Sequence, residues 1–342
     1  MGCLFCARSE NFFFESMKAI SVLLLFRRNN KFQDMKNDKT FDEIAERWKA
    51  DKKPYVKRST YAAYSLLIAN HLRPAFGTQT EITEAFVQRF VLDKLTQGLS
   101  QKSIKDILTV LKMILKFGVK NELTEYRRID IKFPTPRERH RIEVLSKTQQ
   151  RRIMAYIADH FTCLNLGIYI CLCTGMRIGE ICALTWDDID TEAGIIKIDK
   201  TIQRIYLPEG GAKRTEVVID TPKSENSIRE IPMSRSLLRL VKPLKRTADG
   251  RFFVLTNTLR PTEPRIYRNY YKRFLQELGI PALKFHGLRH SFATRCIESR
   301  CDYKTVSVLL GHSNISTTLN LYVHPNLEQK KRCVEQMSRS LR

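Results

Sequence analysis

The sequence predicts a mostly helical α+β protein of two domains, a helical bundle followed by a mixed α/β domain with a small antiparallel sheet. Apolar residues recur at helical spacing over the first third of the chain, whereas its middle holds four short β-like segments separated by turn residues. The length of 342 residues fits two domains of ordinary size, and a 43% apolar composition supplies their cores.

The first predicted domain, residues 40–120, has the pattern of four short helices. Thr40 and Glu43 form a capping-box signature at the start of the first helix, and Pro54 is expected to end that helix. Short helices with short connections pack as a bundle. The remaining three are expected at residues 59–72, at 83–95 and from 100 onward.

Proline and charge patterns refine the second and fourth of these helices. Pro74 is expected to stop the second helix at Leu72, because a proline ring blocks the helical hydrogen-bond ladder. The fourth helix, which Ser100 caps, has an apolar stripe on one face. Its opposite face carries Lys102, Lys105, Lys112 and Lys116.

Residues 121–142 are interpreted as a basic linker, and residues 143–342 as the second domain with its C-terminal tail. Pro134 and Pro136 forbid a continuous helix in the linker, which is rich in arginine. The second domain is predicted to begin with a helix at Ser146. Its β-like segments are expected at 195–198, 201–206, 216–219 and 228–231, with a further piece at 252–255.

Residues 1–39 are interpreted as an N-terminal extension of uncertain role. The apolar run at 17–26 resembles the core of a signal peptide, but no small-residue cleavage site follows it. The run is also too short to span a membrane, so no membrane partner is expected. Met17 and Met35 leave the natural start of translation open.

The cysteines do not form the pattern of a disulfide framework. Their number, nine, is odd, and several lie within apolar runs, which favours free thiols in a reducing cytoplasm. Cys3 and Cys6 form a CxxC motif without a second pair nearby, so no metal site is predicted there.

The charge of the chain points to a polyanionic partner. Fifty-nine lysines and arginines against 36 acidic residues give a net charge of +23, which favours nucleic acid over an anionic membrane. A lysine-lined helix face is usually only solvated. With this total charge, the lysine face of the fourth helix becomes a candidate contact for phosphates.

Several stretches of the second domain concentrate basic and hydroxyl groups at the ends of helices or strands. Singly, each has an ordinary structural explanation, such as a surface arginine or a core tyrosine. Their order, Arg, Lys, His-x-x-Arg, His and Tyr, is what carries a prediction. The stretches lie at residues 174–180, 221–224, 286–290, 310–313 and 317–325.

In this order and spacing, the second domain resembles the catalytic domain of the tyrosine recombinases, or phage-type integrases. Residues 40–120 resemble the helical core-binding domain of that family. The resemblance implies a site-specific DNA recombinase that acts through a 3′-phosphotyrosyl intermediate, in integration or excision of a mobile element or in DNA inversion. The implied active site is Arg177, Lys223, His286, Arg289, His312 and Tyr322.

The chemistry of a phosphodiester explains why these residue types are needed. Arg177 and Arg289 suit two-pronged contacts to the non-bridging oxygens, and His312 can add a hydrogen bond to the same oxygens. Tyr322 would be the nucleophile. Lys223 would protonate the departing 5′-oxygen, and His286 would accept the tyrosine proton.

The same reading sets expectations for cofactors and partners. No cofactor is expected, because the sequence has no phosphate-binding loop for ATP and no carboxylate cluster for a metal. The expected partner is double-stranded DNA, with a homotetramer on two DNA sites implied by the resemblance. An accessory DNA-bending protein is a further candidate partner, and the expected location is the nucleoid in a bacterial cytoplasm.

Alternatives remain open for single residues and for the activity. Lys213 is a second candidate lysine, and the alternative tyrosines are Tyr267, Tyr270, Tyr271 and Tyr303. Glu180 is interpreted as a structural partner that orients the site, and His290 as a residue that shapes the pocket. A type IB topoisomerase and a DNA-binding protein without activity are the rival functions. The separate arm-binding domain of many integrases is not evident in residues 1–39. A mobile-element integrase, an inversion enzyme and a chromosome-resolving recombinase therefore all stay open.

Overall fold

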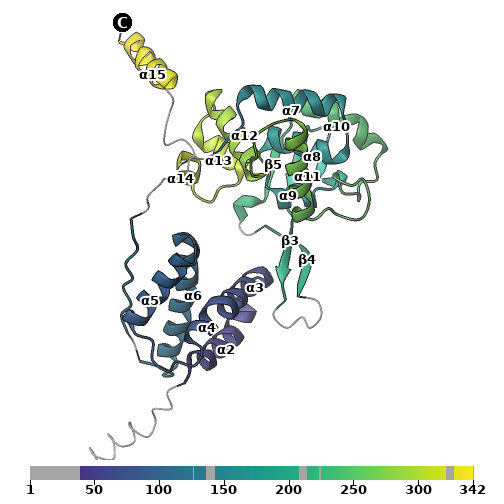
Figure 1. The fold of residues 1–342 in the computed structure, drawn as a ribbon. Helices are drawn as coiled ribbons and strands as arrows, with labels where there is room; N and C mark the ends of the chain where they lie inside the picture. The colour runs from purple at the N-terminus through teal and green to yellow at the C-terminus, as the bar shows by residue number, and fades with distance from the viewer. Residues whose placement is uncertain are drawn as a thin grey trace, which may run out of the picture. The chain divides into compact units, whose positions relative to one another are not determined.

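The computed structural model describes residues 39–125, 127–135, 143–207, 214–222, 225–320 and 327–341 (Figure 1). The chain divides into two compact units, residues 1–135 with 206–210 and residues 136–205 with 211–342. Each unit contains its own hydrophobic core. The predicted fold class, mostly helical with small sheets, is confirmed. Within the described residues, no helix has the length and apolar character needed to cross a membrane.

The N-terminal unit is a bundle of short helices. The capping box predicted at Thr40 and Glu43 is formed, and the apolar residues of the first helix, including Trp48, are buried. The apolar stripe of the last helix faces the same core. The elements are α2 (Phe41–Lys52), η1 (Lys53–Tyr55), α3 (Arg58–Leu67), η2 (Ile68–Leu72), α4 (Arg73–Phe76), α5 (Glu84–Thr96) and α6 (Gln101–Lys120).

The predicted end of the second helix at Leu72 is wrong, because the helical path continues through Pro74 to Phe76. A π-helical turn at η2 precedes the proline, and the N–H of Arg73 donates to the carbonyl of Ile68, five residues earlier. This wider turn opens the hydrogen-bond ladder just before the ring that would otherwise collide with it. Because the helical path continues past Leu72, the aromatic side chain of Phe76 is buried in the core of the bundle.

The first half of the predicted linker is packed against the helical unit. Gln88 of α5 donates to the carbonyl of Lys132 at 3.1 Å and accepts from its N–H at 3.0 Å. The N–H of Asp130 donates to Glu84 at 2.8 Å, and the side chains of 129, 131 and 133 pack on the core. Residues 127–133 therefore extend along the bundle, while residues 136–142 lie outside the described residues.

The C-terminal unit is built around α8 (Cys163–Thr174), which is apolar on all sides and buried. Its long-range contacts are with α7, α10 and α12. The remaining helices are α7 (Lys147–Asp159), α9 (Ile178–Ala183), η3 (Trp186–Asp188), η4 (Glu225–Ser227), α10 (Arg235–Thr247), α11 (Pro264–Glu277), α12 (His286–Glu298), α13 (Tyr303–Leu310), α14 (Ile315–Asn320) and α15 (Leu327–Ser340).

A small antiparallel sheet covers part of this core. Its order is β1 (Ile189–Asp190), β2 (Ile195–Ile198) and β5 (Arg229–Pro232), with Ile196 opposite Ile231. A second, two-stranded arm is formed by β3 (Thr201–Tyr206) and β4 (Thr215–Asp220) (Figure 1). Four of the predicted strands are thus present, each with both ends within one residue of the expectation.

The fifth β-like piece, at 252–255, does not form a strand. Phe253 makes only isolated bridges, to Thr185 and to Thr258. The chain turns back directly afterwards at Asn257, which has a positive φ of 51°. Four apolar residues in a row therefore mark a buried turn here, and Val254 and Leu255 enter the core from it.

Candidate active site

Four of the six predicted active-site residues are described, and the C-terminal unit brings them together. Arg177 lies at the N-cap of α9, His286 and Arg289 lie in the first turn of α12, and His312 directly follows α13. Arg177 and Arg289 donate to the carbonyls of Gly311 and Leu310, the two residues that precede His312, so the three side chains belong to one site. Lys223 and Tyr322 lie outside the described residues.

Two glycines with left-handed backbones form the turns that build this site. Gly175 ends α8 with φ +66°, and a Cβ there would lie 2.5 Å from Phe292 and 2.7 Å from Leu310. Gly311 ends α13 with φ +63°, and its Cβ would lie 2.8 Å from the carbonyl oxygen of Asn226. Only glycine fits both the conformation and the space. The turns bring backbone carbonyls of distant segments into the site.

Arg289 is the buried base of the site, only 2% exposed. Its Nη1 donates to the carbonyl of Gly175 at 2.8 Å, and its Nη2 donates to the carbonyl of Leu310 at 2.5 Å. Burial, followed by the positive charge of Arg177, lowers the pKa of Arg289, but a guanidinium still carries its charge at neutral pH. The arginine therefore holds a fixed positive charge beneath the site.

Arg177 is held at one edge and open to solvent at the other. Its Nη1 donates to Glu180 at 2.7 Å and its Nη2 donates to the carbonyl of Gly311 at 2.9 Å. The side chain is nevertheless 35% exposed. The remaining N–H groups of this guanidinium are thus available to an incoming anion, and the side chain cannot rotate freely.

Glu180 is buried beside Arg177, a position that fits its interpretation as an orienting partner. The residue is 3% exposed and also accepts two hydrogen bonds from Arg229, at 2.9 and 3.1 Å. Burial alone would raise its pKa, but the hydrogen bonds and charges of Arg229 and Arg177 hold the pKa below its usual value. The side chain is therefore an ionised carboxylate between two guanidiniums, which suits positioning better than proton donation.

Arg229 is a site residue that sequence reasoning missed. It lies on β5, and its Nε donates to the carbonyl of Leu309 at 2.7 Å. With Arg177 and Arg289, it binds three consecutive carbonyls at the C-terminal end of α13, those of residues 309, 310 and 311. The sequence did contain a signal, because Arg229 stands two positions before Ile231 in a strand, and residues two apart in a strand share one side. Both side chains are buried.

The two described histidines of the predicted set are neutral at pH 7. Burial and then the charges of Arg289 and Arg177 lower the pKa of His312 to about 4, and its Nδ1 lies 2.8 Å from the hydroxyl of Thr318. His286 is exposed, and partial desolvation of its ring, followed by the charge of the neighbouring His290, lowers its pKa to about 4. Neutral imidazoles can donate or accept a proton, as acid–base chemistry requires.

The site as a whole is suited to a phosphate monoanion. The site holds three guanidiniums, those of Arg177, Arg229 and Arg289, against the one carboxylate of Glu180, so positive charge is in excess. The arginines are also fixed by backbone carbonyls before any ligand binds. Such preorganised donors stabilise charge that develops in a transition state. Among the described residues, no group of three or more histidine, cysteine or acidic side chains could hold a metal ion.

Comparisons with known proteins place the chain in a family. The family model "Phage integrase family" matches residues 143–329, and "Phage integrase, N-terminal SAM-like domain" matches residues 40–95. The chain belongs to the phage integrase family. The predicted resemblance is thereby confirmed, and the chain is a tyrosine recombinase, an enzyme that cuts and rejoins DNA.

Relatives and solved structures that are similar to this chain are also tyrosine recombinases and integrases. The tyrosine recombinase XerC-like protein of Caldanaerobacter subterraneus is 29% identical over 307 residues, 82% of this chain and 78% of the relative. The ICEBs1 integrase of Bacillus subtilis is 25% identical over 289 residues, 80% and 76% of the two chains. Among solved structures, the Tn1549 transposon integrase in complex with a circular intermediate DNA has a TM-score of 0.70 at 21% identity, covering 87% of this recombinase and 99% of that chain.

The pKa shifts predict the pH dependence of the recombinase. The rate of DNA cleavage at low DNA concentration reports the ionisation of the free enzyme. Because His286 and His312 are held neutral down to a pKa of about 4, this rate is expected to stay level from about pH 8 to pH 5.5. The measurement is cleavage under kcat/KM conditions across this range.

A loss of cleavage caused by acid unfolding must be separated from a loss caused by protonation of the active-site histidines. The pKa of both histidines is lower in the folded state, so the unfolded state binds more protons and stability falls as the pH drops below about 6.5. Circular dichroism at each pH identifies that loss. A folded protein whose cleavage rate halves near pH 6.5 would contradict the lowered pKa values.

The buried Arg229–Glu180 pair is predicted to stabilise the fold. Arg229→Ala is expected to cost about 3–5 kcal/mol of unfolding free energy, because it leaves a buried carboxylate without its main partner. The Arg229→Met, Glu180→Met double variant removes both charges and should recover part of this loss. Urea denaturation measures the values.

A matched control is the Arg204–Glu263 pair, which is far more exposed. Arg204→Ala is expected to cost far less than Arg229→Ala, because a solvent-screened ion pair contributes little to stability. Equal losses for Arg204→Ala and Arg229→Ala would show that burial does not distinguish the two pairs, and the assigned role of Arg229 would then be wrong.

Proposed function

We propose that this recombinase integrates and excises a mobile genetic element at specific DNA sites. The observation that carries the proposal is the pair Arg177 and Arg289, fixed by carbonyls on an electropositive site of a phage integrase fold. The mobile-element role draws on its relatives, which include the ICEBs1 integrase and, at 28% identity over 208 residues, the transposase of transposon Tn916 from Enterococcus faecalis. DNA inversion and chromosome resolution stay the alternatives.

In the proposed reaction, the two arginines bind the non-bridging oxygens of the scissile phosphate, and His312 donates to the same oxygens. The hydroxyl of Tyr322 attacks phosphorus and gives its proton to neutral His286. The bond to the 5′-oxygen breaks, and Lys223 protonates that oxygen as it leaves. A 5′-hydroxyl of another strand then reverses these steps, so that the strands are rejoined without ATP.

We propose matching roles for the parts of the chain. Residues 40–120 form the core DNA-binding domain, residues 121–142 the linker, and residues 143–342 the catalytic domain with its tail. The proposed partner is double-stranded DNA, bound by four copies on two sites. The likeness to the λ integrase tetramer bound to a Holliday junction, at a TM-score of 0.58, supports this assembly. An accessory DNA-bending protein and action at the bacterial nucleoid complete the proposal.

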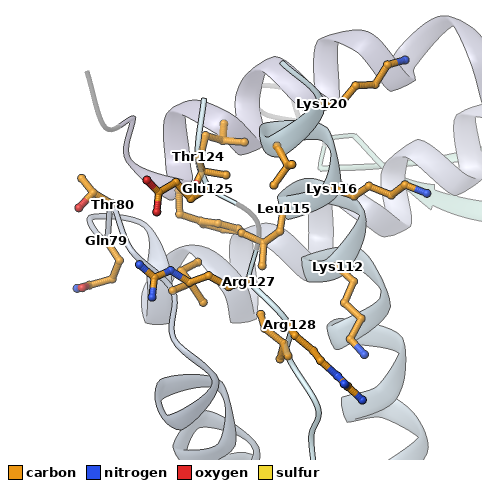
Figure 2. Close-up of a pocket in the computed structure, with 15 residues that line it drawn as sticks. Gln79, Thr80, Lys112, Leu115, Lys116, Lys120, Thr124, Glu125, Arg127 and Arg128 are labelled. Carbon is orange, nitrogen blue, oxygen red and sulfur yellow. The ribbon is translucent and has the colours of Figure 1, made fainter. Parts of the chain in front are cut away.

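A basic pocket in the N-terminal unit supports its DNA-binding role. The pocket has a volume of about 610 Å³ and an apolar floor that includes Phe41, Ile44 and Leu115. Figure 2 shows three lysines spaced along α6 at its border, with two arginines from the segment that follows α6. These basic residues are Lys112, Lys116, Lys120, Arg127 and Arg128. Lys112 and Lys116 belong to the predicted lysine face, and Lys120 extends that face to the end of α6.

A suicide DNA substrate tests the proposed function. The substrate carries a nick that lets the fragment beyond the cut diffuse away, which traps the covalent complex. A protein–DNA adduct stable to denaturant is expected with DNA from the ends of the element. Its absence, with DNA binding retained, would favour a DNA-binding protein without activity. Relaxation of supercoiled DNA without exchange between two sites would favour a topoisomerase.

Binding to DNA is predicted to weaken steeply with salt. If the lysine face and the linker together contact about eight phosphates, the logarithm of the binding constant should fall with a slope near −7 against the logarithm of salt concentration. Lys112→Gln with Lys116→Gln should reduce the slope by about 2. Fluorescence anisotropy measures both values. A slope near −2 for the unaltered protein would mean that most of the positive charge faces solvent.

A further inference from the structure

The corner between α12 and α13 brings two cysteines together. Arg300 follows the end of α12 with a left-handed φ of 65°. The N–H of Cys301 donates to the carbonyl of Cys296 at 3.0 Å, and the N–H of Arg300 donates to that of Ile297 at 2.9 Å. These two bonds define a Schellman motif, which frequently brings together the side chains of the two residues joined by the longer-range bond. Here those residues are Cys296 and Cys301, and the thiol of Cys301 lies within hydrogen-bond reach of Cys296.

The two thiols differ in exposure. Cys301 is exposed, whereas Cys296 is half-buried and packs against the small apolar cluster of Ala293, Val306 and Leu310. Burial, followed by the charge and hydrogen bond of the Cys301 thiol, raises the pKa of Cys296 to about 12. The part of this shift due to Cys301 disappears once Cys301 is oxidised. An accessible thiol therefore stands beside a sheltered one.

The other described cysteines are either sheltered or placed on another helix. Cys163 and Cys173 are half-buried on α8. Cys171 and Cys182 are fully buried in the core around α8, and burial raises the pKa of both. Cys333 is exposed on α15, a helix separate from this corner. Of the thiols in the described residues, the pair at the corner combines an exposed nucleophile with a neighbour in reach.

We propose that Cys296 and Cys301 are a redox-sensitive pair that closes to a disulfide and slows DNA cleavage. A small-molecule disulfide oxidises the pair. The Cys301 thiolate displaces one thiol from it, and Cys296 then displaces the second, so that two protein thiols are oxidised and two small thiols are released. A disulfide needs a Cα–Cα separation of roughly 4.4–6.8 Å. The backbone bond between the two residues already holds them close.

The disulfide would act on the active site through α12 and α13. Its formation draws the sulfur of Cys296 away from the cluster that contains Leu310. The carbonyl of Leu310 accepts the hydrogen bond from Arg289, which lies two turns earlier on the helix of Cys296. Repacking this cluster therefore loosens one of the two carbonyls that fix Arg289. This second half of the inference rests on the proposed function.

Tryptic mapping of the full-length protein tests the inference. Arg295, Arg300 and Lys304 are cleavage sites, so the reduced protein releases residues 296–300 and 301–304 as separate peptides. After treatment with glutathione disulfide, one linked peptide is expected, with the summed mass less two hydrogens. Cleavage of a suicide substrate should become at least threefold slower, and dithiothreitol should reverse both changes.

Two variants complete the experiment. Cys301→Ser, at an exposed position, should fold normally and make cleavage insensitive to the oxidant, whereas Cys333→Ser should behave like the unaltered protein. Separate peptides after oxidation would overturn the inference, and so would a linked peptide with an unchanged cleavage rate. A reduced protein that does not cleave DNA at all would refute the proposed function, while the linked peptide would still decide whether the redox pair exists.

Discussion

Replacing Tyr322 with phenylalanine is expected to abolish covalent attachment to DNA and to leave DNA binding within about twofold of the unaltered protein. The substitution removes only the hydroxyl oxygen that would attack phosphorus, so no other step can supply the phosphotyrosyl bond. Trapping on a suicide substrate measures the first effect, and a gel-shift assay on the same preparation measures the second.

The other tyrosines define the control. Tyr267 and Tyr271 are buried in the core of the C-terminal unit, which makes both unsuited to attack DNA, and the hydroxyl of Tyr267 also donates to the carbonyl of Leu164 at 2.7 Å. Tyr303 is 39% exposed at the start of α13 and is the better rival. Tyr303→Phe should keep full attachment. An adduct that persists in Tyr322→Phe and is lost in Tyr303→Phe would move the nucleophile to Tyr303.

Lys223→Ala is expected to slow cleavage of normal DNA by about 10²–10⁴-fold, the usual contribution of a general acid. DNA with a 5′-sulfur at the scissile bond should be cleaved almost as fast as by the unaltered protein, because a thiolate leaves without being protonated. Single-turnover cleavage of the two substrates gives the ratio. This comparison isolates proton donation from binding.

Two further variants make the comparison decisive. Lys213→Ala should cleave both substrates normally, since Lys213 is the less favoured of the two candidate lysines. Arg177→Lys should be slow on both, because an ammonium cannot reproduce the two-pronged contact of a guanidinium. Equal losses for Lys223→Ala on the two substrates would mean that Lys223 binds phosphate and does not act as an acid.

Local sequence signals predicted most of the secondary structure, and their failures have local causes. Capping residues such as Thr40 and Ser146 fixed helix starts because their side chains satisfy N–H groups within the same turn. The prediction that Pro74 ends the second helix was wrong because a π turn before the proline accommodates its ring, and that turn depends on packing in the bundle. The run at 252–255 misled because a buried turn and a buried strand share the same apolar composition.

The site was predictable only in part, because its residue types follow a known order but its contacts join distant segments. Arg177 and Arg289 could be selected by their place in that order. The carbonyl of Gly311 that holds Arg177 lies 134 residues further along the chain, and no local pattern reports such a pairing. Arg229 was missed for the same reason, since its partners come from α9 and α13.

The shared helix end at Leu309–Gly311 has a consequence for how the enzyme responds to heat and to mutation. Proteins open locally before they unfold globally, and a short helix at the edge of a core is among the segments that open most easily. Fraying of the eight residues of α13 would remove one carbonyl partner each from Arg177, Arg229 and Arg289 at the same time, while their bonds to Glu180 and to the carbonyl of Gly175 would remain. Local opening of α13 would therefore loosen all three arginines at once, before the rest of the C-terminal unit unfolds.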